Sequence, residues 1–260
     1  MSENRVALIT GANKGIGLQI AKDLTGHGLT VLIGSRKLEN GEKAAATIGE
    51  KAHAIQLDVT DQASITAAAE RIRKEFGRLD VLVNNAGIVG EFAEGTPFEE
   101  RLKFNAPSQA PLSYIRTIYE TNVFGVIAVT QAMLPLLREA PAGRIVNVGS
   151  SLGSLTLNAN PESQFRNIFG SAYSPSKAAL SATTLAFAIE LEKTSIKVNV
   201  VCPGYVATDL NDHRGYRTVE QGAKQAVKMA LLSSVMVGEG CTALAAAIET
   251  STGCDAVAPV

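Results

Sequence analysis

The sequence has no tryptophan, and among its 260 residues only three are cysteines and three are histidines. The cysteines, Cys202, Cys241 and Cys254, form no C-x-x-C pair, which argues against a disulfide framework or a zinc cluster. The histidines are scattered and show no spacing typical of metal ligands. We therefore expect no bound metal ion and a reducing, cytoplasmic location.

A charge of one sign and long apolar runs are also missing. The 24 basic and 25 acidic residues give a formal net charge of −1, so nothing favours a nucleic acid or an anionic membrane as partner. No window reaches the roughly 18 uninterrupted apolar residues of a spanning helix, because even residues 123–137 include Gly125 and Pro135. The N-terminal residues lack the features of a signal peptide, and we expect none.

Short apolar runs rich in Val, Ile and Leu alternate with longer amphipathic segments. The runs predict strands at residues 5–10, 29–34, 52–57, 79–83, 143–148 and 196–201. The segments between them predict helices at residues 16–26, 62–76, 119–137 and 174–193. This alternation is typical of an α/β protein with a Rossmann-like, doubly wound parallel sheet that helices cover on both faces. Ligands bind such a sheet beyond the carboxyl ends of its strands.

No linker or repeat divides the chain, so we predict a single domain over residues 1–260. Two stretches without clear periodicity, residues 88–118 and 154–171, each follow a predicted strand and would overhang the ligand crevice. Residues 233–260 form an atypical C-terminal segment in which residues 243–248 are compatible with a short helix and no seventh strand is evident.

The segment Thr10-Gly-Ala-Asn-Lys-Gly-Ile-Gly17 lies between the first predicted strand and the first predicted helix. Glycines at 11, 15 and 17 allow a sharp turn and a close approach to a pyrophosphate, which the N-terminus of the following helix attracts. A glycine triplet also occurs in ordinary tight turns, and its position between strand and helix favours the dinucleotide interpretation.

The end of the second predicted strand carries a cation where dinucleotide-binding proteins often have an acid. An acidic residue about 20 residues after the glycines holds the ribose 2′-hydroxyl of NAD. Here Ser35 and Arg36 occupy that place, and Lys14 in the glycine turn adds a second cation. Guanidinium and ammonium groups pair with a 2′-phosphate, so the sequence favours NADP(H), unless both are ordinary surface cations.

Tyr173 and Lys177 lie four residues apart, on one face of a predicted helix. A phenol with a reference pKa of about 10 is a poor acid at neutral pH, and a nearby ammonium favours its phenolate. The pair is therefore suited to proton transfer, although a tyrosine at a helix start followed by a solvated lysine would look the same.

Taken together, these motifs resemble the classical short-chain dehydrogenases/reductases, and the resemblance covers about residues 5–232. It rests on the glycine turn, Asp58, Asn84-Asn-Ala-Gly87, Asn122, Ser150, the Tyr173/Lys177 pair and Pro203-Gly204 with Thr208, in this order. The long segments before Asn122 and before Tyr173 are most similar to those of carbonyl reductase-like members.

The resemblance implies four catalytic residues. Tyr173 would protonate the carbonyl oxygen during reduction and act as base in the reverse direction, and Ser150 would hold that oxygen. Ser150 is preferred to Ser151 because Gly153 follows it at the family's spacing. Lys177 would lower the pKa of the tyrosine and bind the nicotinamide ribose, and Asn122 would hold a water that links the lysine to solvent.

The resemblance also implies the residues along the cofactor. Asp58 would contact the adenine, Asn85 the ribose region, the backbone near Val206 the carboxamide and Thr208 the phosphates. The expected cofactor-binding residues are Gly11, Asn13, Lys14, Gly15, Ile16, Gly17, Ser35, Arg36, Asp58, Val59, Asn85, Ala86, Gly87, Tyr173, Lys177, Pro203, Gly204, Val206 and Thr208. A structural role stays open for several: Asp58 as a turn cap, Asn84 or Asn85 as braces between strands.

The substrate and the assembly are less defined. Candidate apolar walls of a substrate pocket, besides Ser150, are Val89, Phe92, Phe165, Phe169 and Tyr205, unless these aromatics only anchor their loops. They suggest an uncharged, apolar ketone or aldehyde. Three functions stay open: an NADPH-dependent carbonyl reductase, an NAD(P)-dependent alcohol dehydrogenase acting mainly in oxidation, and a non-catalytic NADP(H) sensor. The sequence leaves monomer or homo-oligomer undecided.

Overall fold

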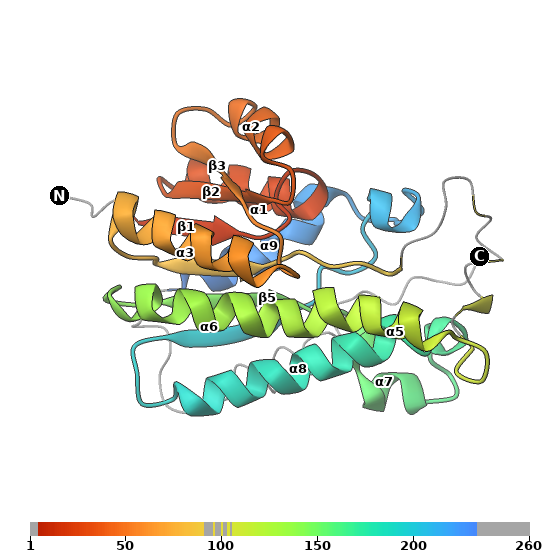
Figure 1. Ribbon diagram of the computed structural model, residues 1–260. Coiled ribbons are helices and arrows are strands. Elements are labelled where there is room, and N and C mark those ends of the chain that lie inside the picture. The colour runs from red at the N-terminus through yellow and green to blue at the C-terminus, as the bar shows by residue number, and fades with distance from the viewer. Residues whose placement is uncertain (1–4, 91–95, 97–99, 101–102, 105, 233–260) are drawn as a thin grey trace.

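The computed structural model describes residues 5–90, 96, 100, 103–104 and 106–232. Six strands form one sheet in the order β3-β2-β1-β4-β5-β6, and every neighbouring pair is parallel. The strands are β1 (Val6–Ile9), β2 (Thr30–Ser35), β3 (Ala52–Gln56), β4 (Val81–Asn84), β5 (Arg144–Val148) and β6 (Lys197–Val201). All six coincide with the predicted runs to within one or two residues at each end, so the predicted Rossmann-like fold is confirmed (Figure 1).

Helices cover both faces of this sheet. They are α1 (Gly15–Gly26), α2 (Leu38–Ala46), α3 (Gln62–Phe76), α5 (Leu112–Tyr119), α6 (Gly125–Arg138), α7 (Leu155–Ala159), α8 (Tyr173–Glu190) and α9 (Val219–Leu231). Short turns are η1 (Glu120–Phe124), which is π-helical, and the 3-10 turns η2 (Ser151–Gly153), η3 (Arg166–Ile168) and η4 (Asp209–Asn211). Sequence periodicity predicted α1, α3, α6 and α8 but not α2, α5, α7 or α9. Of these, α7 and all but the last residue of α5 lie within the stretches 154–171 and 88–118, which the sequence left without secondary structure.

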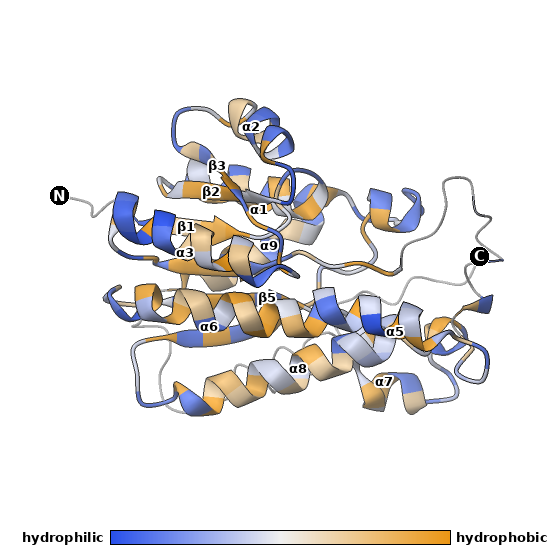
Figure 2. Ribbon diagram, in the orientation of Figure 1, coloured by the Kyte–Doolittle hydropathy of each residue, from blue (hydrophilic) through white to orange (hydrophobic). Residues whose placement is uncertain are grey.

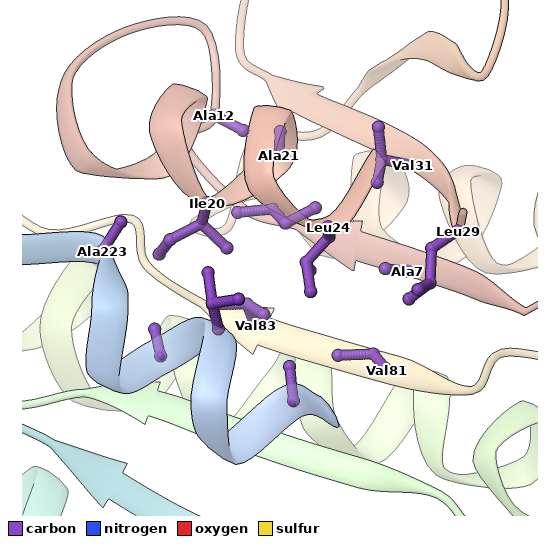
Figure 3. Close-up of a cluster of buried hydrophobic side chains, with 14 of the residues drawn as sticks. Ala7, Ala12, Ile20, Ala21, Leu24, Leu29, Val31, Val81, Val83 and Ala223 are labelled. Carbon is purple, nitrogen blue, oxygen red and sulfur yellow. The ribbon is translucent and has the colours of Figure 1, made fainter. Parts of the chain in front are cut away.

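Alternate strand residues supply two hydrophobic cores, one on each face of the sheet. In β1, Ala7 and Ile9 pack with α1, α2 and α9, whereas Val6 and Leu8 pack with α3, α6 and α8. Figure 3 shows α1 directing its apolar side chains at the first face, and Figure 2 shows the apolar character of the strands. Each fully buried aliphatic side chain contributes about 1.5–3 kcal/mol of transfer free energy, which explains the uninterrupted apolar runs.

The helical segment Leu112–Arg138 is 27 residues long and is apolar enough, by length and composition, to cross a membrane. Half of its most apolar window is buried inside the protein. Its buried residues, among them Val129, Met133 and Leu136, belong to the core on the α3 face of the sheet. This burial is what a core helix of an α/β domain requires, and it accounts for the apolar composition.

The order of the strands places a crevice beside β1 and β4. From β1 the chain moves outward through β2 and β3, then returns to β4 on the other side of β1 and continues outward through β5 and β6. Loops leaving the carboxyl ends of β1 and β4 therefore diverge and leave an opening, where such sheets bind ligands. The predicted helix at residues 243–248 lies outside the described residues.

Candidate active site

A cleft of about 1500 Å³ opens at the carboxyl ends of the strands. Most of the predicted cofactor residues line it: Gly11, Asn13, Lys14, Gly15, Ile16, Gly17, Ser35, Arg36, Asp58, Val59, Asn85, Ala86, Gly87, Tyr173, Lys177, Pro203 and Thr208. Two do not. Val206 is only 4% exposed, and Gly204 packs against the side chain of Arg217. The size and lining of the cleft fit an extended dinucleotide.

The glycine loop forms a cradle that larger residues would fill. Gly11 and Gly15 have φ of +62° and +57°, in the left-handed region that glycine adopts without strain. A Cβ on Gly17 would lie 2.4 Å from Asn85 Nδ2 and 2.8 Å from the Gly11 carbonyl oxygen. No side chain caps the N-terminus of α1, so its first N–H groups and the positive end of the helix dipole are available to a phosphate. These observations fit the pyrophosphate of a dinucleotide.

Thr10 and Asn85 fasten the glycine loop to the end of β4. The Thr10 hydroxyl accepts hydrogen bonds from the N–H groups of Asn85 (3.0 Å) and Ala86 (2.9 Å). The Asn85 amide donates to the carbonyl oxygens of Thr10 (2.9 Å) and Gly11 (3.1 Å). Asn85 lines the cleft, but its amide group is engaged in holding the loop.

Asn84 and Asp58 also have the structural contacts that the sequence left open. Asn84 is buried and donates to Asn147 Oδ1 on β5 (2.8 Å) and to Thr130 on α6 (3.1 Å). Asp58 accepts from the N–H (2.9 Å) and the hydroxyl (2.7 Å) of Thr60 and so caps the turn after β3. Asn84 therefore braces neighbouring strands. Asp58 both caps a turn and lines the cleft.

Cations gather where β2 ends. Arg36 and Lys37 are exposed and line the cleft, and no acidic residue occupies the end of β2. Within the described part of the chain, the Arg36 side chain makes no ion pair. Lys14 was expected as a second cation for a 2′-phosphate, but it is already paired with an acid. Its Nζ lies 2.6 Å from Asp209 Oδ2, in an ion pair between the glycine loop and the loop after β6.

The Tyr173 side chain lies at the start of α8, is partly exposed and lines the cleft. Burial raises the pKa of Tyr173 to about 12, the hydrogen bond with Ser150 lowers it, and the nearby Cys202 thiol raises it. At neutral pH the phenol therefore carries its proton. Ser150 precedes η2 and accepts a hydrogen bond from the Leu152 N–H (3.2 Å) through the same hydroxyl.

Lys177 follows Tyr173 by one turn of α8 and is 4% exposed. Its Nζ donates to the Val148 carbonyl oxygen (2.7 Å) and lies 5.7 Å from the centre of the Tyr173 ring. Burial lowers the pKa of Lys177 to about 8, and Cys202 raises it. The ammonium is thus near the phenol and directed at the end of β5.

Asn122 is fully buried in the π-helical turn η1. Its amide donates to the Ile88 carbonyl oxygen (2.9 Å) and to the Ser176 hydroxyl (3.0 Å), and its oxygen accepts from the Ile88 N–H (2.9 Å). A Cβ on Gly87 would lie 3.4 Å from Asn122 Oδ1 and 3.5 Å from Lys177 Nζ. Asn122 therefore connects the loop after β4 to α8. Its partner in this loop, Ile88, follows Gly87, which faces Lys177 Nζ.

The predicted substrate residues are dispersed. Val89 lines the cleft, whereas Ser150, Phe165, Phe169 and Tyr205 are not part of its lining. Phe92 lies outside the described residues. Sequence reasoning missed the lining residues Thr117, Glu120 and Thr121, together with Asp209, Leu210, Asp212 and His213. None of these belongs to a motif that links it to the cleft, since they reach it only through the packing of α5, η1 and the loop after β6.

Comparisons with known proteins agree with this geometry. The family model described as short chain dehydrogenase matches residues 5–217. Because this match covers most of the chain, the protein belongs to the short-chain dehydrogenase/reductase family.

Several of the relatives are reductases and dehydrogenases of plants. The chain is 33% identical to (+)-neomenthol dehydrogenase of Arabidopsis thaliana, over 91% of this chain and 95% of that protein. It is also 33% identical to salutaridine reductase of Papaver somniferum, over 89% of this chain and 91% of that protein. The solved structure of that salutaridine reductase superposes with a TM-score of 0.74 at 32% identity, covering 88% of this chain and 96% of the other. The protein is accordingly an oxidoreductase of a family that uses nicotinamide cofactors.

Proposed function

We propose that the protein is an NADPH-dependent carbonyl reductase that converts an uncharged, apolar ketone or aldehyde to an alcohol in the cytoplasm. The observation that carries the reaction type is the Tyr173 phenol in the wall of a dinucleotide-sized cleft, beside Lys177 and with a hydrogen bond to Ser150 that lowers its pKa. Salutaridine reductase, a relative over most of the chain, supports the direction of reduction. The sequence has only three cysteines and no C-x-x-C pair, which supports the compartment.

The choice of NADPH is supported by charge. Arg36 and Lys37 follow β2, where an acid would hold a ribose hydroxyl, and both are exposed to the cleft. A guanidinium forms two parallel hydrogen bonds with a phosphate, and a carboxylate would repel it. Gly11 and Gly15 with the uncapped start of α1 would hold the pyrophosphate.

The residues of the chain divide the work of the reaction. The bound nicotinamide supplies the hydride that the carbonyl carbon accepts. Tyr173, protonated at neutral pH, gives its hydroxyl proton to the carbonyl oxygen, and Ser150 holds that oxygen in place. Lys177, 5.7 Å from the ring centre, offsets the negative charge that the phenol oxygen acquires. Asn122 keeps Ile88, and with it the loop after β4, in position beside Lys177.

Two measurements test this proposal. Purified protein is expected to consume NADPH with some aryl ketones, aldehydes or cyclic diketones, while binding of each cofactor is recorded in parallel. Tight cofactor binding without turnover on any compound would instead indicate a sensor. Arg36→Asp is expected to weaken NADPH binding much more than NADH binding, because the new carboxylate repels the 2′-phosphate. Equal effects on both cofactors would reject the assignment of NADPH.

A further inference from the structure

An ion pair joins two loops that line the cleft. Lys14 belongs to the glycine loop and Asp209 to the loop after β6, and their side chains meet at 2.6 Å although 195 residues separate them. Both residues line the cleft. The side chains are 65% and 55% exposed, so water reaches the pair. The hydrogen bond with Lys14 lowers the pKa of Asp209, which is therefore ionised at neutral pH.

The loop that carries Asp209 is built to hold its carboxylate over the cleft. Thr208 and Asn211 form a capping box around η4, and the His213 N–H donates to the Thr208 carbonyl oxygen (2.9 Å). Asp212 and His213 have φ of +52° and +58°, which non-glycine residues seldom adopt. This turn brings His213 Nε2 to 3.0 Å from Asp209 Oδ1. Strained backbone of this kind persists where surrounding contacts over-determine it, often at ligand sites.

We propose that Asp209 is a positioning residue that competes with the 2′-phosphate of the cofactor for Lys14, and thereby reduces the preference of the protein for NADP(H) over NAD(H). The inference rests on the proposed use of NADP(H). Without a 2′-phosphate in the cleft, Asp209 holds the Lys14 ammonium; when NADPH binds, the ammonium exchanges this carboxylate for the phosphate. NADH has no 2′-phosphate, so its binding leaves the pair intact.

Three properties make this exchange favourable. The four-carbon stem of lysine is flexible, and its ammonium has no fixed donor geometry to preserve. An ion pair exposed to water contributes little free energy, so the contact of Lys14 with a phosphate offsets the loss of its contact with Asp209. A phosphate monoester carries a larger negative charge than a carboxylate and attracts the ammonium more strongly. The exchange therefore weakens NADPH binding only by the free energy of one exposed ion pair.

The test is a set of binding titrations with NADPH and NADH, followed by the fluorescence of the bound reduced nicotinamide. Asp209→Asn removes the competing charge and leaves a side chain of the same size. We expect it to tighten NADPH binding by about two- to fivefold, the range for an exposed ion pair, and to leave NADH binding unchanged. Asp212→Asn is the matched control, because it removes the same charge from the same cleft-lining loop and asparagine tolerates its positive φ. It is expected to leave the ratio of the two dissociation constants unchanged.

A double-mutant cycle isolates the role of Lys14. In a Lys14→Met background, Asp209→Asn is expected to have no effect on NADPH binding. The proposal is overturned if Asp209→Asn weakens NADPH binding, if it changes both cofactors equally, if Asp212→Asn has the same effect, or if its effect survives in Lys14→Met. Failure of the proposed function is visible separately, since the wild-type protein alone would then show no preference for NADPH.

Discussion

The two ends of the sheet each bury a cation, and they treat it differently. At the amino end, Arg144 of β5 is 1% exposed and donates to the carbonyl oxygens of Gly143 (2.8 Å), Ser195 (3.4 Å) and, twice, Leu232 (3.0 and 2.8 Å). At the carboxyl end, Lys177 is 4% exposed and donates to one carbonyl oxygen, that of Val148.

This difference separates a group that stabilises the fold from one that is available for chemistry. Burial and the neighbouring Arg5 lower the pKa of Arg144, but a guanidinium stays charged in proteins and its donors are occupied by carbonyl groups. Burial brings the pKa of Lys177 to about 8, within reach of physiological pH. The amino end thus closes the domain around the end of α9, and the carboxyl end keeps a titratable pair, Tyr173 and Lys177.

The largest expected effect concerns proton transfer at the carboxyl end. Tyr173→Phe removes the proposed proton donor, so we expect ketone-dependent NADPH oxidation to fall by about 10²- to 10⁴-fold while NADPH binding stays within about twofold. Tyr114→Phe is the matched control, because the Tyr114 hydroxyl donates to the Val89 carbonyl oxygen (2.8 Å) and is not hydrogen-bonded to Ser150. It should retain more than a tenth of the activity. Near-normal turnover by Tyr173→Phe would reject the assigned role.

At the amino end a substitution should cost stability and not cofactor affinity. Arg144→Met leaves the carbonyl oxygens of Leu232, Gly143 and Ser195 without this donor, and we expect the free energy of unfolding to fall by about 3 kcal/mol in urea titrations. Arg138→Met, at the exposed end of α6, should change it by less than about 0.5 kcal/mol. Equal stabilities of the two variants would show that the buried guanidinium is dispensable.

The titration of Lys177 should appear in the pH dependence of stability. Its pKa is lowered from 10.5 in the unfolded chain to about 8 in the folded protein, so between these values the unfolded state binds more protons. The free energy of unfolding should therefore rise by up to about 1.4 kcal/mol per pH unit between pH 8 and 10, relative to Lys177→Met. Above pH 10 the raised pKa of Tyr173 lowers the stability of both proteins, because the unfolded chain loses the phenolic proton first, so this effect cancels in the comparison. Urea midpoints at four pH values check this, and parallel curves for the two proteins would contradict it.

The smallest effect compares two glycines of α1. Gly17→Ala places a Cβ 2.4 Å from Asn85 Nδ2 and should destabilise the protein by about 1 kcal/mol while weakening NADPH binding. Gly26→Ala, at the other end of the helix, meets nothing within 4 Å and should stabilise it by about 0.5 kcal/mol. Thermal unfolding with and without NADPH separates the two effects. Loss of affinity in Gly26→Ala would show that the whole helix, and not its first turn, responds to the cofactor.

The sequence predicts the sheet well because five of the six strands are buried on both faces, a pattern that few other structures allow; β3 is the exception, with His53 and Gln56 exposed. Helix α9 was missed, although Thr218 and Gln221 form a capping box that marks its start. Helix α2 has only nine residues and contains Gly41, so its periodicity is weak.

Within the site, success depended on whether a residue belongs to a local motif. The glycine loop and the Tyr173/Lys177 pair were predicted because spacing along the chain fixes their geometry. The pairing of Lys14 with Asp209 was not, because residues 195 positions apart meet only through the fold. Phe165 and Phe169 were expected on the cleft from their chemistry alone, but both are only partly buried in their own loop and neither lines the cleft.

The π-helical turn η1 has a consequence for how this chain tolerates insertions and deletions. A π-turn accommodates one more residue than an α-helical turn, and each residue of an α-helix turns the chain by about 100°. The extra residue changes the rotation of α5 about the helix axis relative to α6. As a result α6 keeps its apolar side on the sheet, while the Tyr114 hydroxyl of α5 reaches the Val89 carbonyl oxygen. Removing one residue from Glu120–Phe124 would restore regular winding and rotate α5 relative to α6, and it would also shift Asn122 relative to Ile88 and Ser176. The length of this turn is thus tied both to the cleft wall that α5 supplies and to the hydrogen bonds that hold the loop after β4.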